Sequence, residues 1–121
     1  MSDKLQIKAL SVNESLAWSK RAGIYVKTKA AKKYREDLIL ILPKIIIPEG
    51  DLTLIAIFGL SNANSDTDNC IKPLQDALQI KYGFNDKRIK SYFVESEMVK
   101  KGSEFIEFSI VKKVSVRKII F

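Results

Sequence analysis

The stretch "LTLIAIFGL" (Leu52–Leu60) decides how this chain folds. Its nearly continuous apolar side chains predict a strand buried on both faces. The preceding "PEGD" (48–51) has the composition of a turn, and the following "SNANSDTDN" (61–69) is polar and predicts a loop. We therefore expect this strand in the interior, with connections on the surface at both ends.

On the C-terminal side, the spacing of Ile71, Leu74 and Leu78 predicts a helix over about 69–81. Proline is tolerated only in the first turn of a helix, so Pro73 places the start near Asp68 or Asn69. Gly83 is a typical helix end. Beyond it, "IKSYFVESEMVKK" (89–101) and "SEFIEFSIVKK" (103–113) predict two strands joined by a turn at Gly102.

On the N-terminal side, "KLQIKALSV" (4–12) alternates as a strand does, and residues 13–28 predict a long loop. "KAAKKYREDLILIL" (29–42) predicts a helix that Pro43 ends. The C-terminal "VSVRKIIF" (114–121) is open to three interpretations, a dimer contact, a docking tail or, as we favour, a last strand. The order of elements predicts an α+β fold, a two-layer sandwich with a mixed β-sheet and helices packed on one face.

Composition bounds the class of protein. With 121 residues, 46% hydrophobic and 29% charged, the chain is expected to form a single globular domain over residues 1–121. No apolar run reaches the length of a membrane span, and the N-terminus lacks the apolar core of a signal peptide. A single cysteine, Cys70, fits a reducing compartment, so a cytoplasmic location is expected. Because the chain has no histidine, mixed Cys/His zinc sites and Ser-His-Asp triads are excluded.

The positive charge is concentrated in one part of the chain. The formal net charge is +7; residues 1–35 hold nine Lys/Arg and two acidic residues, and residues 36–121 hold twelve of each sign. The segment 19–35 contains no acidic residue, which suits a polyanion such as nucleic acid. A basic surface kept for solubility is the alternative. Trp18, Tyr25 and Tyr34 lie in or beside this segment and are candidates either for stacking on bases or for packing.

Acidic residues gather in the segment that follows the predicted central strand. Asp66 and Asp68 are two apart, so in an extended segment both carboxylates point to the same side. Lys72 follows one helical turn later. Asp86 comes back to these residues only if the turn after the helix packs against the end of the central strand. Three carboxylates are typical ligands of a hard divalent cation, and a lysine there can neutralise a phosphate oxygen. Helix capping by the aspartates is the alternative interpretation.

These residues resemble the RusA-type Holliday junction resolvases, whose signature is D-x-D-N-x-x-K-x-x-x-D-A-L followed by G-F and a further aspartate. The resemblance spans residues 5–112, and "SVN" (11–13) is similar to the family's N-terminal Ser-x-Asn. It implies a magnesium-dependent homodimeric endodeoxyribonuclease, with Mn²⁺ as an alternative ion, that acts on four-way DNA junctions. Carried over by position, the matching residues are Asp66, Asp68 and Asp86 as metal ligands and catalytic residues, Lys72 as the catalytic lysine, Asp76 in support, and Asn13 and Asn69 as DNA contacts.

One departure concerns DNA contacts. Well-known members have arginines just before the first motif aspartate, whereas this chain has "SNANS" (61–65). We expect the basic segment to supply the phosphate contacts instead, through Lys20, Arg21, Lys27 and Lys29. Two alternative functions remain, a nuclease for other branched DNA such as flaps or forks, and a non-catalytic DNA-binding module.

Overall fold

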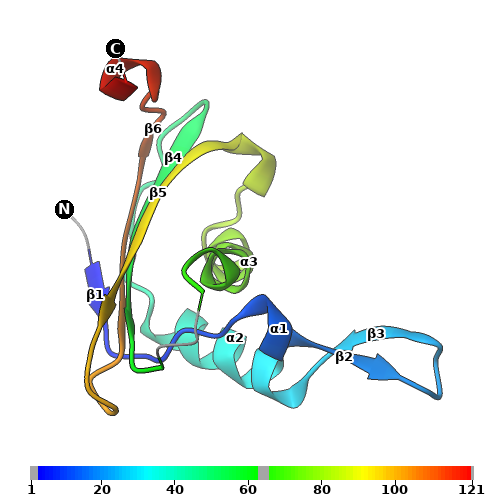
Figure 1. The fold of residues 1–121 in the computed structure, drawn as a ribbon. Coiled ribbons are helices and arrows are strands. Elements are labelled where there is room, and N and C mark those ends of the chain that lie inside the picture. The colour runs from blue at the N-terminus through cyan, green and yellow to red at the C-terminus, as the bar shows by residue number, and fades with distance from the viewer. Residues whose placement is uncertain (1–2, 63–65, 121) are drawn as a thin grey trace.

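The predicted central strand is β4 (Leu52–Leu60) of the computed structural model, which describes residues 3–62 and 66–120. It lies in a four-stranded mixed sheet of order β1-β6-β4-β5 (Figure 1). β4 is parallel to β5 (Ile89–Met98) and antiparallel to β6 (Phe105–Lys112), and β6 is antiparallel to β1 (Asp3–Leu5). The two strands predicted after the second helix are therefore present, and they lie on either side of β4.

Two long helices, α2 (Lys29–Ile41) and α3 (Ile71–Tyr82), cover the same face of this sheet (Figure 1). Leu38 and Leu74 from the helices and Phe58 from β4 are fully buried between the two layers. The α+β fold with helices on one face is thus confirmed. The opposite face of β4 is less covered than expected, because Ile55 and Ile57 are only half-buried there and neither long helix lies on that side.

The N-terminal segment differs from the prediction. The first strand ends at Leu5, where the Ile7 backbone N–H donates to the Leu5 carbonyl at 3.0 Å, and Ser11 then starts the short helix α1 (Val12–Ser15). The Ser11 hydroxyl accepts from the Glu14 backbone N–H at 3.3 Å, and the Glu14 carboxylate accepts from the Ser11 N–H at 3.5 Å. This capping box gives the backbone a helical start that competes with the strand.

The predicted loop over 13–28 is also wrong. After α1, the strands β2 (Leu16–Ser19) and β3 (Ile24–Lys27) pair in antiparallel fashion and form a hairpin that projects from the body of the molecule (Figure 1). We call residues 16–27 the arm. Its turn needs a left-handed residue, and Gly23 supplies it with φ of 68°.

Short elements complete the chain: η1 (Asp68–Cys70), η2 (Asp86–Arg88) and α4 (Arg117–Ile120). The favoured C-terminal strand is wrong, because the described part of the tail ends in α4. Its backbone leaves the sheet at Val114, whose N–H donates to the Thr53 hydroxyl at 2.7 Å and whose carbonyl accepts from the Ser91 hydroxyl at 3.1 Å. Side chains thus satisfy the groups with which a strand would have continued.

Candidate functional site

Asp66 and Asp68 lie in the approach to α3, as the sequence predicts. The Asp66 carboxylate accepts from the Asn69 amide at 3.3 Å, and the Asp68 side chain is exposed. The residues at the two N-cap positions are Thr67 for η1 and Cys70 for α3, and neither makes a side-chain capping hydrogen bond within the described chain. Asp68 stands in the first turn of η1, where the helix dipole favours a carboxylate. The aspartates therefore do not cap these helices, although Asp68 suits its position electrostatically.

Asp86 returns to the side of α3, twenty residues along the chain from Asp66. α3 ends at Gly83, whose φ of 67° reverses the chain, and the buried Phe84 holds the reversal against the core. The Asp86 backbone N–H donates to the Gln79 side-chain oxygen at 2.8 Å. The turn after the helix therefore brings Asp86 back to α3, but to Lys72 and Gln75, and not to Asp66 and Asp68 as the sequence interpretation required.

The Asp86 carboxylate has two donors from α3. Its Oδ2 accepts from the Gln75 amide at 3.0 Å and lies 3.4 Å from the Lys72 ammonium. The hydrogen bond from Gln75, followed by the interactions with Lys72, lowers the pKa of Asp86 below its ordinary value. Asp86 is therefore held as an anion beside the predicted catalytic lysine.

Lys72 bridges two carboxylates. Its Nζ lies 3.0 Å from Asp76 Oδ1 as well as 3.4 Å from Asp86 Oδ2. The hydrogen bond with Asp76 is the largest cause of a raised pKa at Lys72. Because the lysine side chain is 57% exposed, solvent screens both pairs and they contribute little to stability. Asp76 thus makes the ion pair expected of it, its supporting role in a reaction stays a prediction, and Lys72 is a cation that a phosphate can reach from solvent.

The donor chemistry at Asp66, Asp68 and Asp86 suits a hard divalent cation, but their placement does not gather them. Within residues 3–62 and 66–120, no three Asp, Glu, Cys or His side chains are grouped so that they could hold an ion. Asp86 faces Lys72 and Gln75, while Asp66 faces Asn69. A cation shared by all three carboxylates would have to draw Asp86 away from its present donors. The metal-binding role of these residues stays a prediction.

Sequence reasoning missed the glutamines and the tyrosine that position Asp86. Gln75 is buried, and its side-chain oxygen accepts from the Tyr92 hydroxyl of β5 while its amide donates to Asp86. Gln79 holds the Asp86 backbone. A signal existed, since Lys72, Gln75 and Gln79 have the i, i+3, i+7 spacing of one helix face. These residues form a polar stripe, whereas the helix was predicted from its apolar stripe of Ile71, Leu74 and Leu78.

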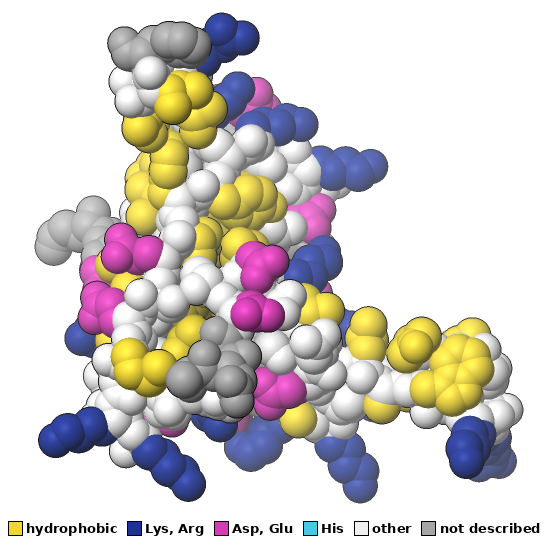
Figure 2. Space-filling view, viewed as in Figure 1, with side chains coloured by type: hydrophobic (Ala, Val, Ile, Leu, Met, Phe, Trp, Pro, Cys, Tyr) yellow, Lys and Arg dark blue, Asp and Glu magenta, His cyan; other side chains and the backbone are white. Residues whose placement is uncertain are grey.

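The predicted DNA contacts lie on or beside the arm, except Asn69, which lies in η1 and donates to Asp66. Lys20 and Arg21 occupy its turn, Lys27 ends β3 and Lys29 begins α2, and all four are exposed, as is Asn13 in α1. Figure 2 shows the arm as an apolar projection with basic side chains at its tip, and acidic side chains gathered near the end of α3 that faces the viewer.

The three aromatic residues have different surroundings. Trp18 and Tyr25 oppose each other on the arm, with ring centroids 5.2 Å apart in an edge-to-face arrangement. They are 55% and 66% exposed, so core packing does not account for them. Tyr34 is 7% exposed and belongs to the core, as the packing alternative expected.

Comparison with known proteins leaves the family open. No protein-family model matches this chain, and no curated protein was found to be similar to it. In the part of the chain that the structure describes, no helix is both long and apolar enough to cross a membrane.

Proposed function

We propose that this chain is a metal-dependent endodeoxyribonuclease of the RusA type that resolves Holliday junctions by paired symmetric nicks. The observation that carries the proposal is the return of Asp86 to Lys72, two residues of the motif that are 14 apart. An anionic carboxylate and a solvent-accessible ammonium side by side are groups that phosphodiester hydrolysis uses.

Each residue has a distinct part in the proposal. Asp66, Asp68 and Asp86 would hold Mg²⁺, which when bound supplies a Lewis acid for the phosphate and lowers the pKa of water. Lys72 neutralises charge on the phosphate or on the departing oxygen, and Asp76 keeps that lysine oriented. Gln75 positions Asp86 and does not touch the substrate.

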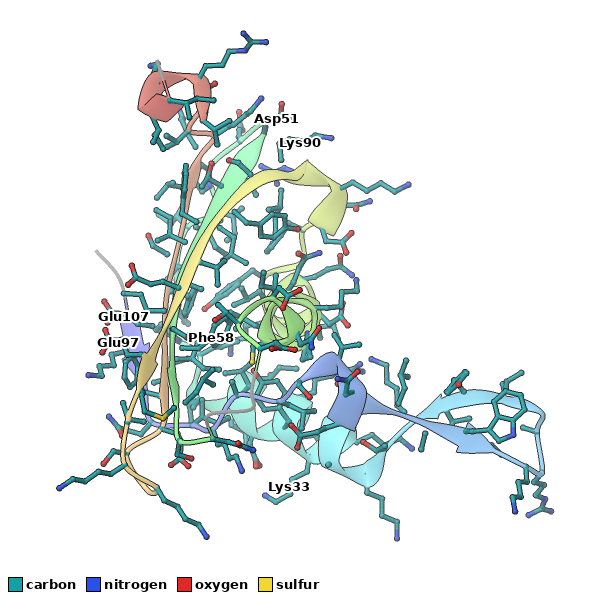
Figure 3. All side chains as sticks on the ribbon, viewed as in Figure 1. Lys33, Asp51, Phe58, Lys90, Glu97 and Glu107 are labelled. Atoms are coloured by element: carbon teal, nitrogen blue, oxygen red, sulfur yellow. The ribbon has the colours of Figure 1, made fainter. Side chains whose placement is uncertain are left out.

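The test is nicking and binding of one labelled four-way junction, with magnesium and with a chelator. Asp66→Asn, Asp68→Asn and Lys72→Ala should each lower nicking by orders of magnitude. Junction binding should survive in the two aspartate variants, and Lys72→Ala should weaken it by no more than one phosphate interaction. Asp51→Asn and Lys90→Ala are matched controls, because these exposed residues lie at the end of the sheet away from α3 (Figure 3). Full nicking by both aspartate variants would end the nuclease proposal.

Two other functions are separated by the same assay. A nuclease for flaps or forks would cut those substrates faster than the junction, at the same residues. A non-catalytic DNA-binding module would bind the junction in a salt-sensitive way and would not need magnesium.

The arm is the proposed duplex-binding surface. Replacing Lys20, Arg21, Lys27 and Lys29 together by Ala should flatten the dependence of log affinity on log salt by about 0.9 for each phosphate that the variant no longer neutralises. The matched control removes the same charge from exposed positions at the two ends of β6: Lys100, Lys101, Lys112 and Lys113. An equal slope in the two quadruple variants would leave the arm as a solubility surface.

A homodimer in the cytoplasm is part of the proposal, because two symmetric nicks in a two-fold junction match a two-fold protein. Light scattering should give the dimer mass at micromolar concentration and low salt. A monomer even with junction added would refute paired nicking.

A further inference from the structure

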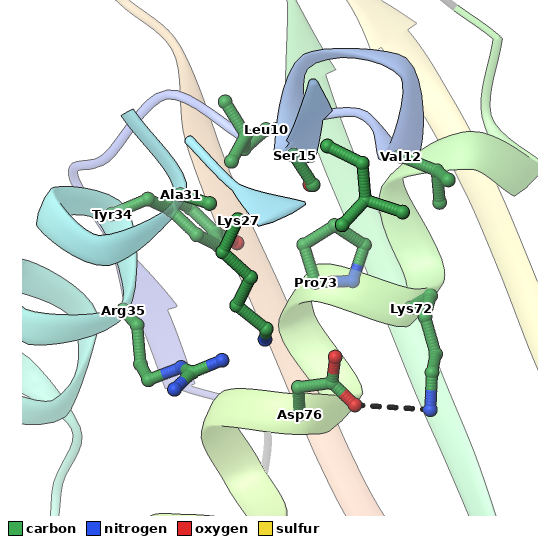
Figure 4. A pocket seen from close by; sticks show the side chains of 11 residues that line it. Leu10, Val12, Ser15, Lys27, Ala31, Tyr34, Arg35, Lys72, Pro73 and Asp76 are labelled. Carbon is green, nitrogen blue, oxygen red and sulfur yellow. Dashed lines mark ion pairs between the residues drawn. The ribbon is translucent and has the colours of Figure 1, made fainter. Parts of the chain in front are cut away.

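A cavity of about 220 Å³ lies directly beside Lys72, between the base of the arm and the helices α2 and α3 (Figure 4). Its walls are mainly apolar and come from the five elements α1, β2, β3, α2 and α3 and from the chain before α1. The lining side chains that carry the argument are Val12, Ala31, Tyr34 and Pro73. It is smaller than the roughly 300–1,000 Å³ sites of drug-sized ligands, so it admits one ring system rather than an extended molecule.

Cationic side chains surround this cavity. Lys27 reaches it from β3, Arg35 from α2 and Lys72 from α3, and the ion pair of Lys72 with Asp76 lies at one side (Figure 4). Asp76 is the one acidic residue among the described lining residues. Lys72 also pairs with Asp86, so three cations face two anions, and the cavity keeps a positive excess that favours a ligand with negative charge outside an uncharged ring.

A buried polar group in the wall lacks a partner. The Tyr34 hydroxyl is buried and makes no hydrogen bond with any described residue. Leaving such a group unpaired costs free energy, and native structures seldom do so without a reason. Figure 4 shows the Tyr34 side chain extending from α2 toward Lys27 in the cavity. A ligand with a donor or acceptor on its ring edge would satisfy the hydroxyl.

From these three observations we infer that the cavity binds a single unpaired nucleotide, with its base between the apolar walls and its phosphate among Lys27, Arg35 and Lys72. The inference rests on the proposed function, since DNA at a branch point supplies the nucleotide. It adds a base-binding site to a centre that otherwise contacts only phosphate. An unpaired base is already out of its stack, so binding it avoids the cost of opening a base pair.

The experiment measures binding in the presence of a chelator, so that cleavage plays no part. A junction with one unpaired nucleotide at the branch point is compared with the same DNA carrying an abasic site there. The wild-type protein should prefer the base by about five- to hundredfold, as one stacked base contributes. Tyr34→Phe should bind the base-containing DNA roughly two- to tenfold more weakly and the abasic DNA equally well.

If the hydroxyl had a structural role instead, Tyr34→Phe would lower the melting temperature and would not change the base preference. Tyr34→Phe removes an unpaired buried group, so its melting temperature should stay the same or rise, and a loss of base preference cannot then come from misfolding. Ala31→Leu is a second variant, because it fills the cavity from α2 without changing charge, and it too should lose the preference. Equal affinities of the wild-type protein for the two DNAs, or an unchanged preference in both variants, would overturn the inference.

Free ligands separate this inference from the proposed function. If the wild-type protein binds no branched DNA, the proposed function fails, and NMR with 2′-deoxynucleoside 5′-monophosphates decides the cavity alone. Shifts of the Ala31 and Tyr34 amide signals with the monophosphate, but not with deoxyribose 5-phosphate, would support a base site. The absence of shifts with either compound would overturn it.

Discussion

Replacement of Gln75 by Met tests whether the α3 face holds Asp86 as the structure implies. Methionine has similar length and helix propensity, so the change removes the amide and retains the shape. Two hydrogen bonds disappear: the one donated to the Asp86 carboxylate at 3.0 Å and the one accepted from the Tyr92 hydroxyl.

The magnitude follows from the surroundings of the two partners. Asp86 reaches solvent and keeps Lys72, so water replaces the Gln75 amide there at little cost in stability. The bond with Tyr92 is a neutral one, which contributes about 0.5–1.5 kcal/mol, and Tyr92 is 40% exposed. We therefore expect the free energy of unfolding to fall by about 1 kcal/mol, which is the middle of that range.

The assays are urea unfolding and an NMR titration of the Asp86 carboxyl group. Since Gln75 is the largest cause of the lowered pKa of Asp86, the variant should raise that pKa toward its ordinary value. Gln79→Met is the matched control, because the Gln79 side chain accepts from the Asp86 backbone N–H and is not among the causes of the lowered Asp86 pKa, so its replacement should leave that pKa unchanged. A stability within about 0.5 kcal/mol of wild type, together with an unchanged Asp86 pKa, would refute the positioning role.

Three further predictions concern the fold. Gly59→Ala would place a Cβ 2.3 Å from the Phe105 ring, so it should lower the free energy of unfolding by about 1–3 kcal/mol, and a second change, Phe105→Leu, should recover part of this loss in urea unfolding. The hydrogen bond from Ser61 lowers the pKa of Glu104 in the folded protein. The ionised carboxylate therefore stabilises the fold at a pH above the ordinary glutamate pKa, and this stabilisation is lost as the pH falls through the lowered pKa. Glu104→Gln should accordingly weaken the fall of the unfolding midpoint between about pH 5 and 3. Burial raises the pKa of the Cys70 thiol to about 11, and thiol labelling at pH 8 should be at least about a hundredfold slower in the native protein than in denaturant; equal rates would contradict its burial.

The positions of β4, α2 and α3 could be predicted because each is encoded by residues close together in the chain. The apolar stretch at 52–60, Pro43 after one helix and Gly83 after the other act within a few residues. Local signals also led to errors where two of them competed. The capping box at Ser11 competed with the strand pattern of 4–12, and the two strands of the arm lie within residues 13–28, which predicted a loop.

The candidate site was predictable only as a set of residues. Asp66, Asp68, Lys72 and Asp86 stand out by type and spacing, but spacing does not say which side chains meet. Only the tertiary structure brings Asp86 back to Lys72 and sets Asp66 against Asn69 instead.

By itself, the sequence determined the layers of this protein, its local turns and the concentration of positive charge in residues 1–35. The tertiary structure alone decided that Lys27, Arg35 and Lys72 surround one cavity, and that the described chain offers no partner to Tyr34 in its wall. The physical reason is the separation along the chain of the residues that interact. Helix and strand patterns are set by hydrogen bonding and burial over a few residues, whereas a site depends on where separate elements pack, and that is decided by the core as a whole.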